Sequence, residues 1–340
     1  MPENTKIEWC AATINPVWGC DNNCEYCYAR GIARRFGGEV GKKEKRYLRE
    51  HNLACDIDVE ILQDFYPTFL ESQYAKLESL LKKWDSPRCK RRSIFLDSMS
   101  DIAFWQPEWV ERVLELIRQH PKHAYLLLTK DPAVYGRHEW PSSVWCGVTA
   151  TNQEEADKLI PELFHEAVKQ SIENLFVSLE PMRGEIEIMQ YLRSCVACQR
   201  KEPDCGYRHH GEAIHLKGVI VGGMTGAGAL PMHPDWARRI RDDCRMAGVD
   251  FFFKQWGEWI APFQMTRPSE LYGDWLDEVP KWDDRPFCRR DIHKPVKVGK
   301  KAAGRLLDGR EWNDLPWRKR KTPATDINVM GLDGRNEIGV

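Results

Sequence analysis

The sequence predicts an α/β fold, a partial (β/α)6-type TIM-like barrel with a cysteine-rich insertion and an irregular C-terminal extension. Two observations predict it. Short apolar runs alternate with longer amphipathic stretches, as in a βα repeat that builds a parallel sheet. Six of the expected strands also run directly into polar or glycine residues. In a parallel barrel such strand ends meet at one edge, where active sites are built.

Seven apolar runs are the expected strands: Thr13–Trp18, Ser93–Asp97, Ala124–Thr129, Val144–Thr149, Leu175–Leu179, Gly218–Val221 and Phe251–Phe253. The amphipathic stretches between them predict helices. These are one long or two shorter helices within Asp58–Trp84, and single helices at Glu108–Gln119, Gln153–Gln170 and Asp235–Ala247. Asn152 suits an N-cap for the helix that follows it, because Glu154 and Glu155 lie in its first turn.

The expected organisation is one barrel domain over residues 1–260, with the cysteine-rich insertion at about 187–217. A C-terminal extension over residues 261–340 would pack on the barrel. It is rich in Trp and Pro and has no clear linker before it. We therefore expect it to cover the barrel or to hold a substrate.

Composition narrows the class of protein. No apolar run approaches the roughly 18 residues of a membrane span, and the N-terminus MPENTKIEW lacks the pattern of a secretory signal. We therefore expect a cytoplasmic protein without a membrane partner. The net charge of −1 creates no general attraction to nucleic acid, although basic stretches lie at 30–49, 82–92 and 318–321. Such stretches are usually solvated faces; the other interpretation is contact with nucleic acid.

Three cysteines lie within eight residues, Cys20, Cys24 and Cys27, on the loop after the first expected strand. Clustered cysteines in a reducing compartment are more often metal ligands than disulfides. Three thiolates can hold three irons of a four-iron cluster and leave the fourth iron open to a small molecule. A closed zinc site would need a fourth ligand, such as Cys10 or a remote residue. Zinc binding and ordinary packing are the alternatives.

The CxxxCxxC spacing, with Tyr26 before the last cysteine, closely resembles the radical SAM superfamily. The wider chain, from Ile7 to Trp312, resembles a phage and bacterial branch of radical-SAM-like proteins without an assigned reaction. The segments that carry this resemblance are IEWCAATINPVWGC, FLDSMSD, LLLTK, WCGVTATNQEEADKL, VSLEP, VIVGG, FFFKQWG and VGKKAAGRLLDGREW. The sequence departs from this branch at one place. Met224 and Thr225 follow Gly222 and Gly223, where the family usually has Glu-Ser.

The resemblance implies a radical SAM enzyme. Its [4Fe–4S] cluster would cleave S-adenosylmethionine reductively, and the resulting 5′-deoxyadenosyl radical would abstract hydrogen from an unidentified substrate. A nucleic-acid base is one candidate substrate, and an electron donor such as a flavodoxin or ferredoxin is an implied partner. The alternative is a non-catalytic metal-binding protein, with zinc or an iron–sulfur cluster, that interacts with nucleic acid.

The resemblance also implies cofactor contacts. Asp101, after the second strand, would accept from the methionine amino group. Thr149, Asn152 and Glu180, at the ends of the fourth and fifth strands, would meet the ribose and the carboxylate. An ordinary alternative for Asp101 is a helix N-cap.

Other candidates lie at neighbouring strand ends. Lys130 is expected to neutralise the methionine carboxylate or a substrate anion, or else to be a buried ion-pair partner. Lys254 and Gln255 would face the substrate, and together with Lys130 they are the candidate catalytic residues. Gly222 and Gly223 would allow close backbone approach to the adenine.

A second group of metal-ligand residues consists of Cys195, Cys198, Cys205 and His209. Three thiolates and an imidazole suit tetrahedral zinc. An auxiliary iron–sulfur cluster and the absence of any metal are the alternatives.

Overall fold

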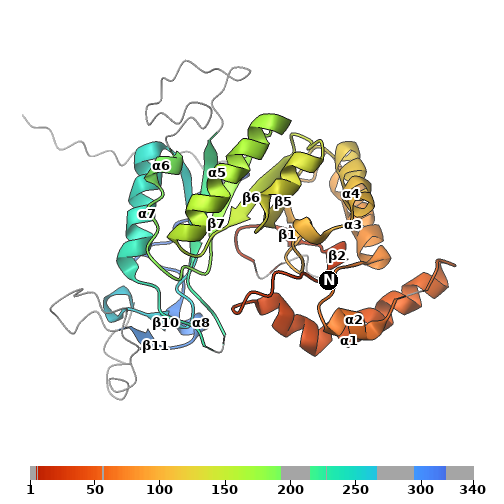
Figure 1. The fold of residues 1–340 in the computed structure, drawn as a ribbon, viewed down its shortest axis with the longest axis horizontal. Helices are drawn as coiled ribbons and strands as arrows, with labels where there is room; N and C mark the ends of the chain where they lie inside the picture. The colour runs from red at the N-terminus through yellow and green to blue at the C-terminus, as the bar shows by residue number, and fades with distance from the viewer. Residues whose placement is uncertain are drawn as a thin grey trace, which may run out of the picture.

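The computed structural model describes residues 5, 7–55, 57–192, 215–226, 228–265 and 295–318. Its main element is a seven-stranded, all-parallel sheet that curls into a half-barrel, with helices on its outer face (Figure 1). The strand order is β1-β4-β5-β6-β7-β8-β9. The bounds are β1 Ala12–Thr13, β4 Ser93–Phe95, β5 Ala124–Thr129, β6 Val144–Thr149, β7 Leu175–Leu179, β8 Leu216–Gly222 and β9 Asp250–Gln255. The predicted partial TIM-like barrel is thus confirmed.

The first predicted strand, Thr13–Trp18, is not one strand. β1 joins the main sheet, whereas β2 (Val17–Trp18) pairs antiparallel with β3 (Thr68–Phe69). Pro16 lies between β1 and β2 and has no N–H with which to continue a ladder. The side chain of Asn15 accepts hydrogen bonds from the Met99 N–H and the Ser98 hydroxyl instead. The chain therefore leaves the main sheet before it reaches the cysteines.

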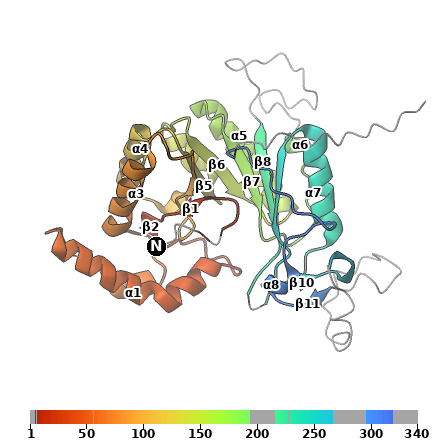
Figure 2. The ribbon, with the colours of Figure 1, turned by 180° about the vertical axis from the view of Figure 1, so that it is seen from behind.

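Helices α3 (Glu71–Trp84), α4 (Pro107–Gln119), α5 (Gln153–Gln170) and α7 (Pro234–Ala247) pack on the convex face of the sheet (Figures 1 and 2). Asp58–Trp84 forms two helices, since α2 spans Val59–Gln63. Asn152 caps α5 as predicted, accepting a 2.9 Å hydrogen bond from the Glu155 N–H. Shorter elements are α6 (Met189–Leu192), α8 (Lys300–Ala303) and the antiparallel pair β10 (Trp259–Ile260) and β11 (Val296–Lys297). Among the described residues no helix combines the length and apolarity that a membrane span requires.

Helix α1 (Tyr28–Glu50) starts at the last cysteine of the first group, and the sequence patterns did not predict it. Its buried face consists largely of small residues at four-residue spacing, such as Ala29, Ala33, Gly37 and Gly41, which give no strong apolar periodicity. The glycines let α2 approach closely. A Cβ on Gly37 would lie 2.5 Å from the Leu62 carbonyl oxygen.

The concave face of the sheet is filled by aromatic side chains from both ends of the described chain. Trp9, Trp145, Phe176 and Trp317 belong to one buried cluster, and the Trp317 indole N–H donates to the Trp9 carbonyl at 2.9 Å. The segment before Trp317 lies along β9, where the Phe253 N–H donates to the Trp312 carbonyl at 3.0 Å. The late segment 312–318 thus covers one edge of the sheet and part of its interior.

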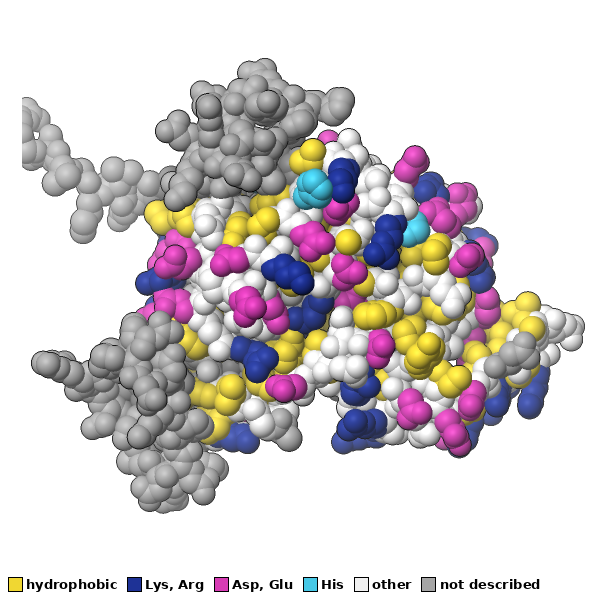
Figure 3. Space-filling model, viewed as in Figure 1, with side chains coloured by type: hydrophobic (Ala, Val, Ile, Leu, Met, Phe, Trp, Pro, Cys, Tyr) yellow, Lys and Arg dark blue, Asp and Glu magenta, His cyan; other side chains and the backbone are white. Residues whose placement is uncertain are grey.

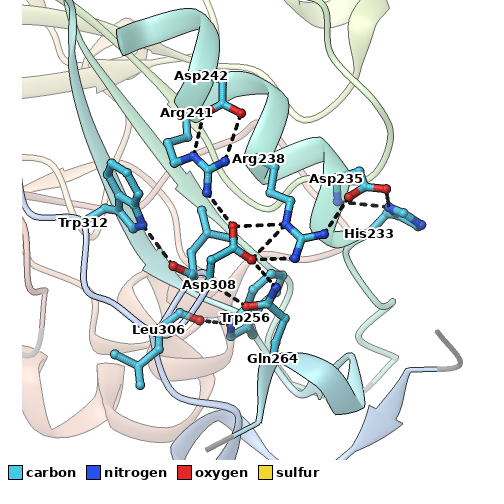
Figure 4. A network of polar contacts seen from close by, with 11 residues as sticks. His233, Asp235, Arg238, Arg241, Asp242, Trp256, Gln264, Leu306, Asp308 and Trp312 are labelled. Atoms are coloured by element: carbon cyan, nitrogen blue, oxygen red, sulfur yellow. Dashed lines mark hydrogen bonds and ion pairs between the residues drawn. The ribbon is translucent and has the colours of Figure 1, made fainter. Parts of the chain in front are cut away.

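Asp308, which precedes this late segment, connects its part of the chain to α7 (Figure 4). Its carboxylate accepts hydrogen bonds from Arg238, Arg241 and Gln264, and the side chain of Gln264 also accepts from the Asp308 N–H. Partial burial alone would raise the pKa of Asp308, but these donors hold it well below its usual range. The carboxylate is therefore ionised at neutral pH, where it can pair with both arginines.

A buried histidine at the opposite end of the strands makes stability depend on pH. His123 is fully buried before β5, accepts from the Arg92 N–H and lies 3.7 Å from Asp85. Lys122 and His120 also face it, and burial lowers its pKa to about 4. Between about pH 6.5 and 4 the unfolded chain binds a proton that the folded protein does not. The free energy of unfolding should therefore fall by about 2 kcal/mol from pH 7 to pH 5 through this group.

His123→Asn keeps an acceptor for the Arg92 N–H and removes the titration. Urea unfolding at pH 7 and pH 5 should show a pH-dependent loss about 2 kcal/mol smaller than in the unmodified protein. His165→Asn, an exposed position on α5, is the control and should leave the difference unchanged. Equal pH dependence in all three proteins would contradict the assignment to His123.

Candidate functional site

The loop that carries the first three cysteines is anchored by backbone contacts. The Gly19 N–H donates to the Met99 carbonyl at 2.8 Å, and the Cys20 N–H donates to the Phe65 carbonyl at 2.9 Å. Gly19 has φ +102°, and a Cβ there would lie 2.2 Å from the Tyr66 carbonyl oxygen. Both the conformation and the close approach require glycine. The loop therefore has a fixed starting point.

The thiols of Cys20, Cys24 and Cys27 are free and half-buried. The Cys20 sulfur accepts from the Asn22 N–H, and the Cys27 sulfur caps α1 by accepting from the Arg30 N–H, both at 3.4 Å. Burial raises the pKa of Cys20 to about 12. Burial also raises the pKa of Cys24, although the charge of Lys130 opposes this. The raised pKa values of Cys20 and Cys24 favour the thiol form at neutral pH, and a bound metal would favour the thiolate that ligates it.

Three thiols on one loop fit the iron–sulfur cluster that the spacing predicts, because cysteine thiolates are the usual ligands of such clusters. In the part of the chain that the structure describes, no three His, Cys, Asp or Glu side chains converge on a site for a metal ion. A cluster places each thiol on a different iron, so its thiols stand farther apart than the ligands of a single ion.

Asp101 ties the cysteine loop to the main sheet. Its buried carboxylate accepts from the Asn22 amide at 2.6 Å, the Thr129 hydroxyl at 2.6 Å and the Lys130 N–H at 2.9 Å. It also caps a short 3-10 helix, Ile102–Phe104, by accepting from the Ala103 N–H at 3.0 Å. Burial raises its pKa in spite of these donors. The N-cap role that we gave as the alternative is therefore the one present in the structure.

Two cations lie against Tyr26, the aromatic residue of the cysteine motif. The Lys130 ammonium and the Arg183 guanidinium each lie 5.6 Å from the ring centroid. Lys130 also donates to Glu155 at 3.0 Å, so it is an ion-pair partner, as its alternative interpretation stated. Burial alone would raise the pKa of Glu155, but hydrogen bonds from Lys130 and Thr151 hold it below its usual value. Tyr26 is thereby fixed between the cysteines and the barrel.

A cavity lies beside the cysteine loop, at the C-terminal ends of the strands. Its polar lining comes from β6, β7 and β9 and from the loops after β7 and β8, and apolar side chains complete it. The lining residues are Ile7, Trp9, Cys24, Tyr26, Cys27, Tyr28, Phe95, Leu128, Thr149, Ser178, Glu180, Pro181, Gly223, Met224, Thr225 and Lys254. This is the edge of a parallel barrel at which active sites are expected.

An ion pair forms part of the cavity wall. The Lys254 ammonium lies 2.7 Å from one Glu180 oxygen and 2.9 Å from the other, and both side chains are mostly buried. Gly222 leaves room for this pair, since a Cβ there would lie 3.2 Å from the Glu180 carboxyl carbon. Gly222 therefore contributes by leaving space for the Glu180 side chain, and it is not itself a lining residue of the cavity.

Gly223 lines the cavity, and its close approach is to the chain's own backbone. A Cβ on Gly223 would lie 1.9 Å from the Trp256 carbonyl oxygen. At this point the backbone at Gly223 passes close to the backbone at Trp256 and Gly257. The buried Gln255 joins the two, because its side-chain amide donates to the Gly223 carbonyl at 2.8 Å and accepts from the Gly257 N–H. Gln255 therefore supports the wall from outside.

The structure thus divides the predicted site residues into two groups. Cys24, Cys27, Thr149, Glu180, Gly223 and Lys254 line the cavity, whereas Cys20, Asp101, Lys130, Asn152, Gly222 and Gln255 do not. Sequence reasoning did not single out the lining residues Ser178 and Tyr28. Ser178 sits inside an apolar run, where a single hydroxyl gives no signal. Cys195, Cys198, Cys205 and His209 lie outside the described residues.

The fold and the site define a parallel α/β half-barrel protein with a cysteine-lined cavity at the C-terminal edge of its sheet. Residues 4–316 match the sequence profile of a family described as "Protein of unknown function (DUF5131)". The chain belongs to this family. No curated protein sequence matches it.

Solved structures of spore photoproduct lyase are similar at a low level. A mutant with bound AdoMet and dinucleoside spore photoproduct has a TM-score of 0.39 and 12% identity over 71% of this chain and 63% of that one. Another mutant has a TM-score of 0.37 and 14% identity over 63% and 56%. The chain thus spans less than two thirds of these proteins. Similarity at this level carries no argument about activity or substrate.

Proposed function

We propose that the chain is a radical SAM enzyme in which Cys20, Cys24 and Cys27 bind a [4Fe–4S] cluster and S-adenosylmethionine occupies the adjoining cavity. One observation carries this proposal. Three free, half-buried thiols lie on a single anchored loop, and two of them, Cys24 and Cys27, line a cavity at the C-terminal strand ends of a parallel half-barrel. Three thiols leave one iron of a four-iron cluster without a protein ligand, so a small molecule can bind it.

The cofactors would supply the redox chemistry. With the cluster reduced by one electron, S-adenosylmethionine would split into methionine and a 5′-deoxyadenosyl radical, which would take a hydrogen atom from the substrate to give 5′-deoxyadenosine and a substrate radical. A flavodoxin or ferredoxin is the proposed source of the electron.

The chain's own residues bind and orient in this proposal. Thr149 and Ser178 offer hydroxyls, and Glu180 a carboxylate, to the ribose and amino groups of S-adenosylmethionine. Lys254, held by Glu180, offers the nearest ammonium to a substrate in the cavity. Asp101 is assigned a positioning role, because its two oxygens already accept four hydrogen bonds.

The test begins with anaerobic reconstitution of the full chain with iron and sulfide. We expect visible cluster absorbance, an EPR signal after dithionite reduction that S-adenosylmethionine alters, and release of 5′-deoxyadenosine. Cys24→Ser should abolish all three, since two thiolates cannot retain the cluster in its site. Cys89→Ser, which removes a free half-buried thiol outside the loop, is the matched control and should change none of them.

Two results would overturn the proposal. One is a fully reconstituted protein whose EPR signal does not respond to S-adenosylmethionine and which releases no 5′-deoxyadenosine. The other is stoichiometric zinc in place of iron, bound through the same three cysteines.

A further inference from the structure

Helix α1 carries a surface that neither the cysteine site nor the barrel uses. Of the eight large hydrophobic side chains that are exposed among the described residues, six belong to the segment 28–66. Three of them lie on α1 at four-residue spacing: Tyr28, Ile32 and Phe36, with exposed fractions of 53%, 37% and 49%. That spacing places them on one side of the helix. The stripe lies beside the row of buried Ala and Gly residues, about 100° around the helix from it, because each stripe residue directly precedes a buried one.

The stripe begins at the cavity. Tyr28 lines the cavity together with Cys27 and donates its hydroxyl hydrogen to the Ser98 carbonyl at 2.7 Å. From there the helix leads outward and stands apart from the helices that cover the sheet (Figures 1 and 2). Phe36 lies eight residues further on, which is about 12 Å along the helix axis. A flexible ligand lying along α1 would therefore pass directly from the stripe into the cavity.

The outer half of the same exposed side is basic. α1 holds eight basic and three acidic residues, a net charge of +5 in a chain whose total is −1. Arg46 and Arg49 are exposed and form no ion pair among the described residues, while Lys42 pairs with Glu39 and exposed Lys43 lies near the same carboxylate. Figure 3 shows dark-blue, yellow and magenta side chains side by side at the lower right, where α1 and α2 lie. Uncompensated cations beside exposed rings fit a polyanion that also has flat apolar groups.

We propose that the exposed side of α1 binds single-stranded nucleic acid and leads one nucleotide into the cavity. Phosphates would lie against Lys43, Arg46 and Arg49, and unpaired bases would stack on Phe36 and Tyr28. A duplex keeps its bases stacked on one another, so the aromatic stripe favours the single strand. This inference rests on the proposed function, because it names the substrate class of the same site.

The experiment measures fluorescence anisotropy of a labelled single-stranded DNA oligonucleotide of mixed sequence, titrated with the full chain over a salt series without S-adenosylmethionine. The double variant Lys43→Glu/Arg46→Glu should weaken binding at least about tenfold and lower the slope of log K against log salt by about 1.4. The matched control is Lys300→Glu/Lys301→Glu, which makes the same change in charge at exposed residues of α8. It should weaken binding less than about twofold.

Phe36→Ala separates stacking from charge. It should weaken binding about tenfold and leave the salt slope unchanged, because the substitution removes a stacking surface and no cation. Met246→Ala, at an exposed apolar residue of α7, should have no effect on binding.

Several outcomes would overturn the inference. The first two are that the chain does not bind the oligonucleotide at low salt, or that both double variants lose the same affinity for it. The other two are that a duplex of the same sequence binds as tightly as the single strand, or that the chain binds only vesicles that contain phosphatidylserine. The two proposals fail separately. Release of 5′-deoxyadenosine without binding of the strand would refute only this inference, and binding through α1 without any such release would refute only the proposed reaction.

Discussion

Asp101→Ala is expected to lower the free energy of unfolding by about 3 kcal/mol and to reduce the iron that the protein retains after reconstitution. The substitution leaves the buried Thr129 hydroxyl and the part-buried Ala103 and Lys130 N–H groups without their acceptor. An unsatisfied buried donor costs about 1–3 kcal/mol. The loss also frees the Asn22 side chain, through which Asp101 holds the cysteine loop.

The matched control for this change is Asp131→Ala. Asp131 caps the next 3-10 helix, Pro132–Arg137, and accepts from the Ala133 N–H, but its side chain is about half exposed. Its removal should cost about 1 kcal/mol and leave the iron content unchanged. Urea unfolding and iron analysis check both expectations. Equal losses of stability in the two variants would show that Asp101 acts as a helix cap only.

Gly223→Ala is expected to destabilise the protein by about 3 kcal/mol and to disrupt the cavity wall. The added methyl group would stand 1.9 Å from the Trp256 carbonyl oxygen, and that atom belongs to the backbone and cannot rotate away. The backbone is equally close at the neighbouring residues, since a Cβ on Gly257 would lie 2.1 Å from the Met224 carbonyl oxygen. The two backbones can separate only if the end of β8 or of β9 moves.

Gly184→Ala serves as the control, because a Cβ there meets no atom within 4 Å. It should change the free energy of unfolding by less than about 0.5 kcal/mol. Thermal or urea unfolding compares the two variants. A Gly223→Ala protein as stable as the Gly184→Ala protein would mean that the crossing of the two strand ends is not close in solution.

Much of the sheet was predictable because its strands are continuous apolar runs, which is typical of parallel strands buried on both faces. Val144–Thr149, Leu175–Leu179 and helix Gln153–Gln170 have the predicted bounds. The cavity at the C-terminal strand ends followed from the same reasoning, since the polar residues that end the strands mark that edge.

Local pattern could not reveal α1 or the roles of several polar residues. The buried side of α1 consists of small residues, so its packing depends on α2 and not on its own apolar pattern. Asp101 and Gln255 follow strands just as Glu180 and Lys254 do, yet the first two accept or donate within the wall and the other two face the cavity. That distinction depends on the direction of each side chain, and the sequence does not specify it.

The contact between Trp9 and Trp317 has a consequence for how the protein is made. These residues are 308 positions apart and lie in the same buried aromatic cluster, joined by a hydrogen bond. A nascent chain that has not yet released Trp317 from the ribosome holds strands β1 to β9 without the residues that fill their inner face. Synthesis at about 5–20 residues per second leaves that apolar interior open to water for many seconds. The half-barrel therefore completes its core only once Trp317 has been synthesised and can pack beside Trp9.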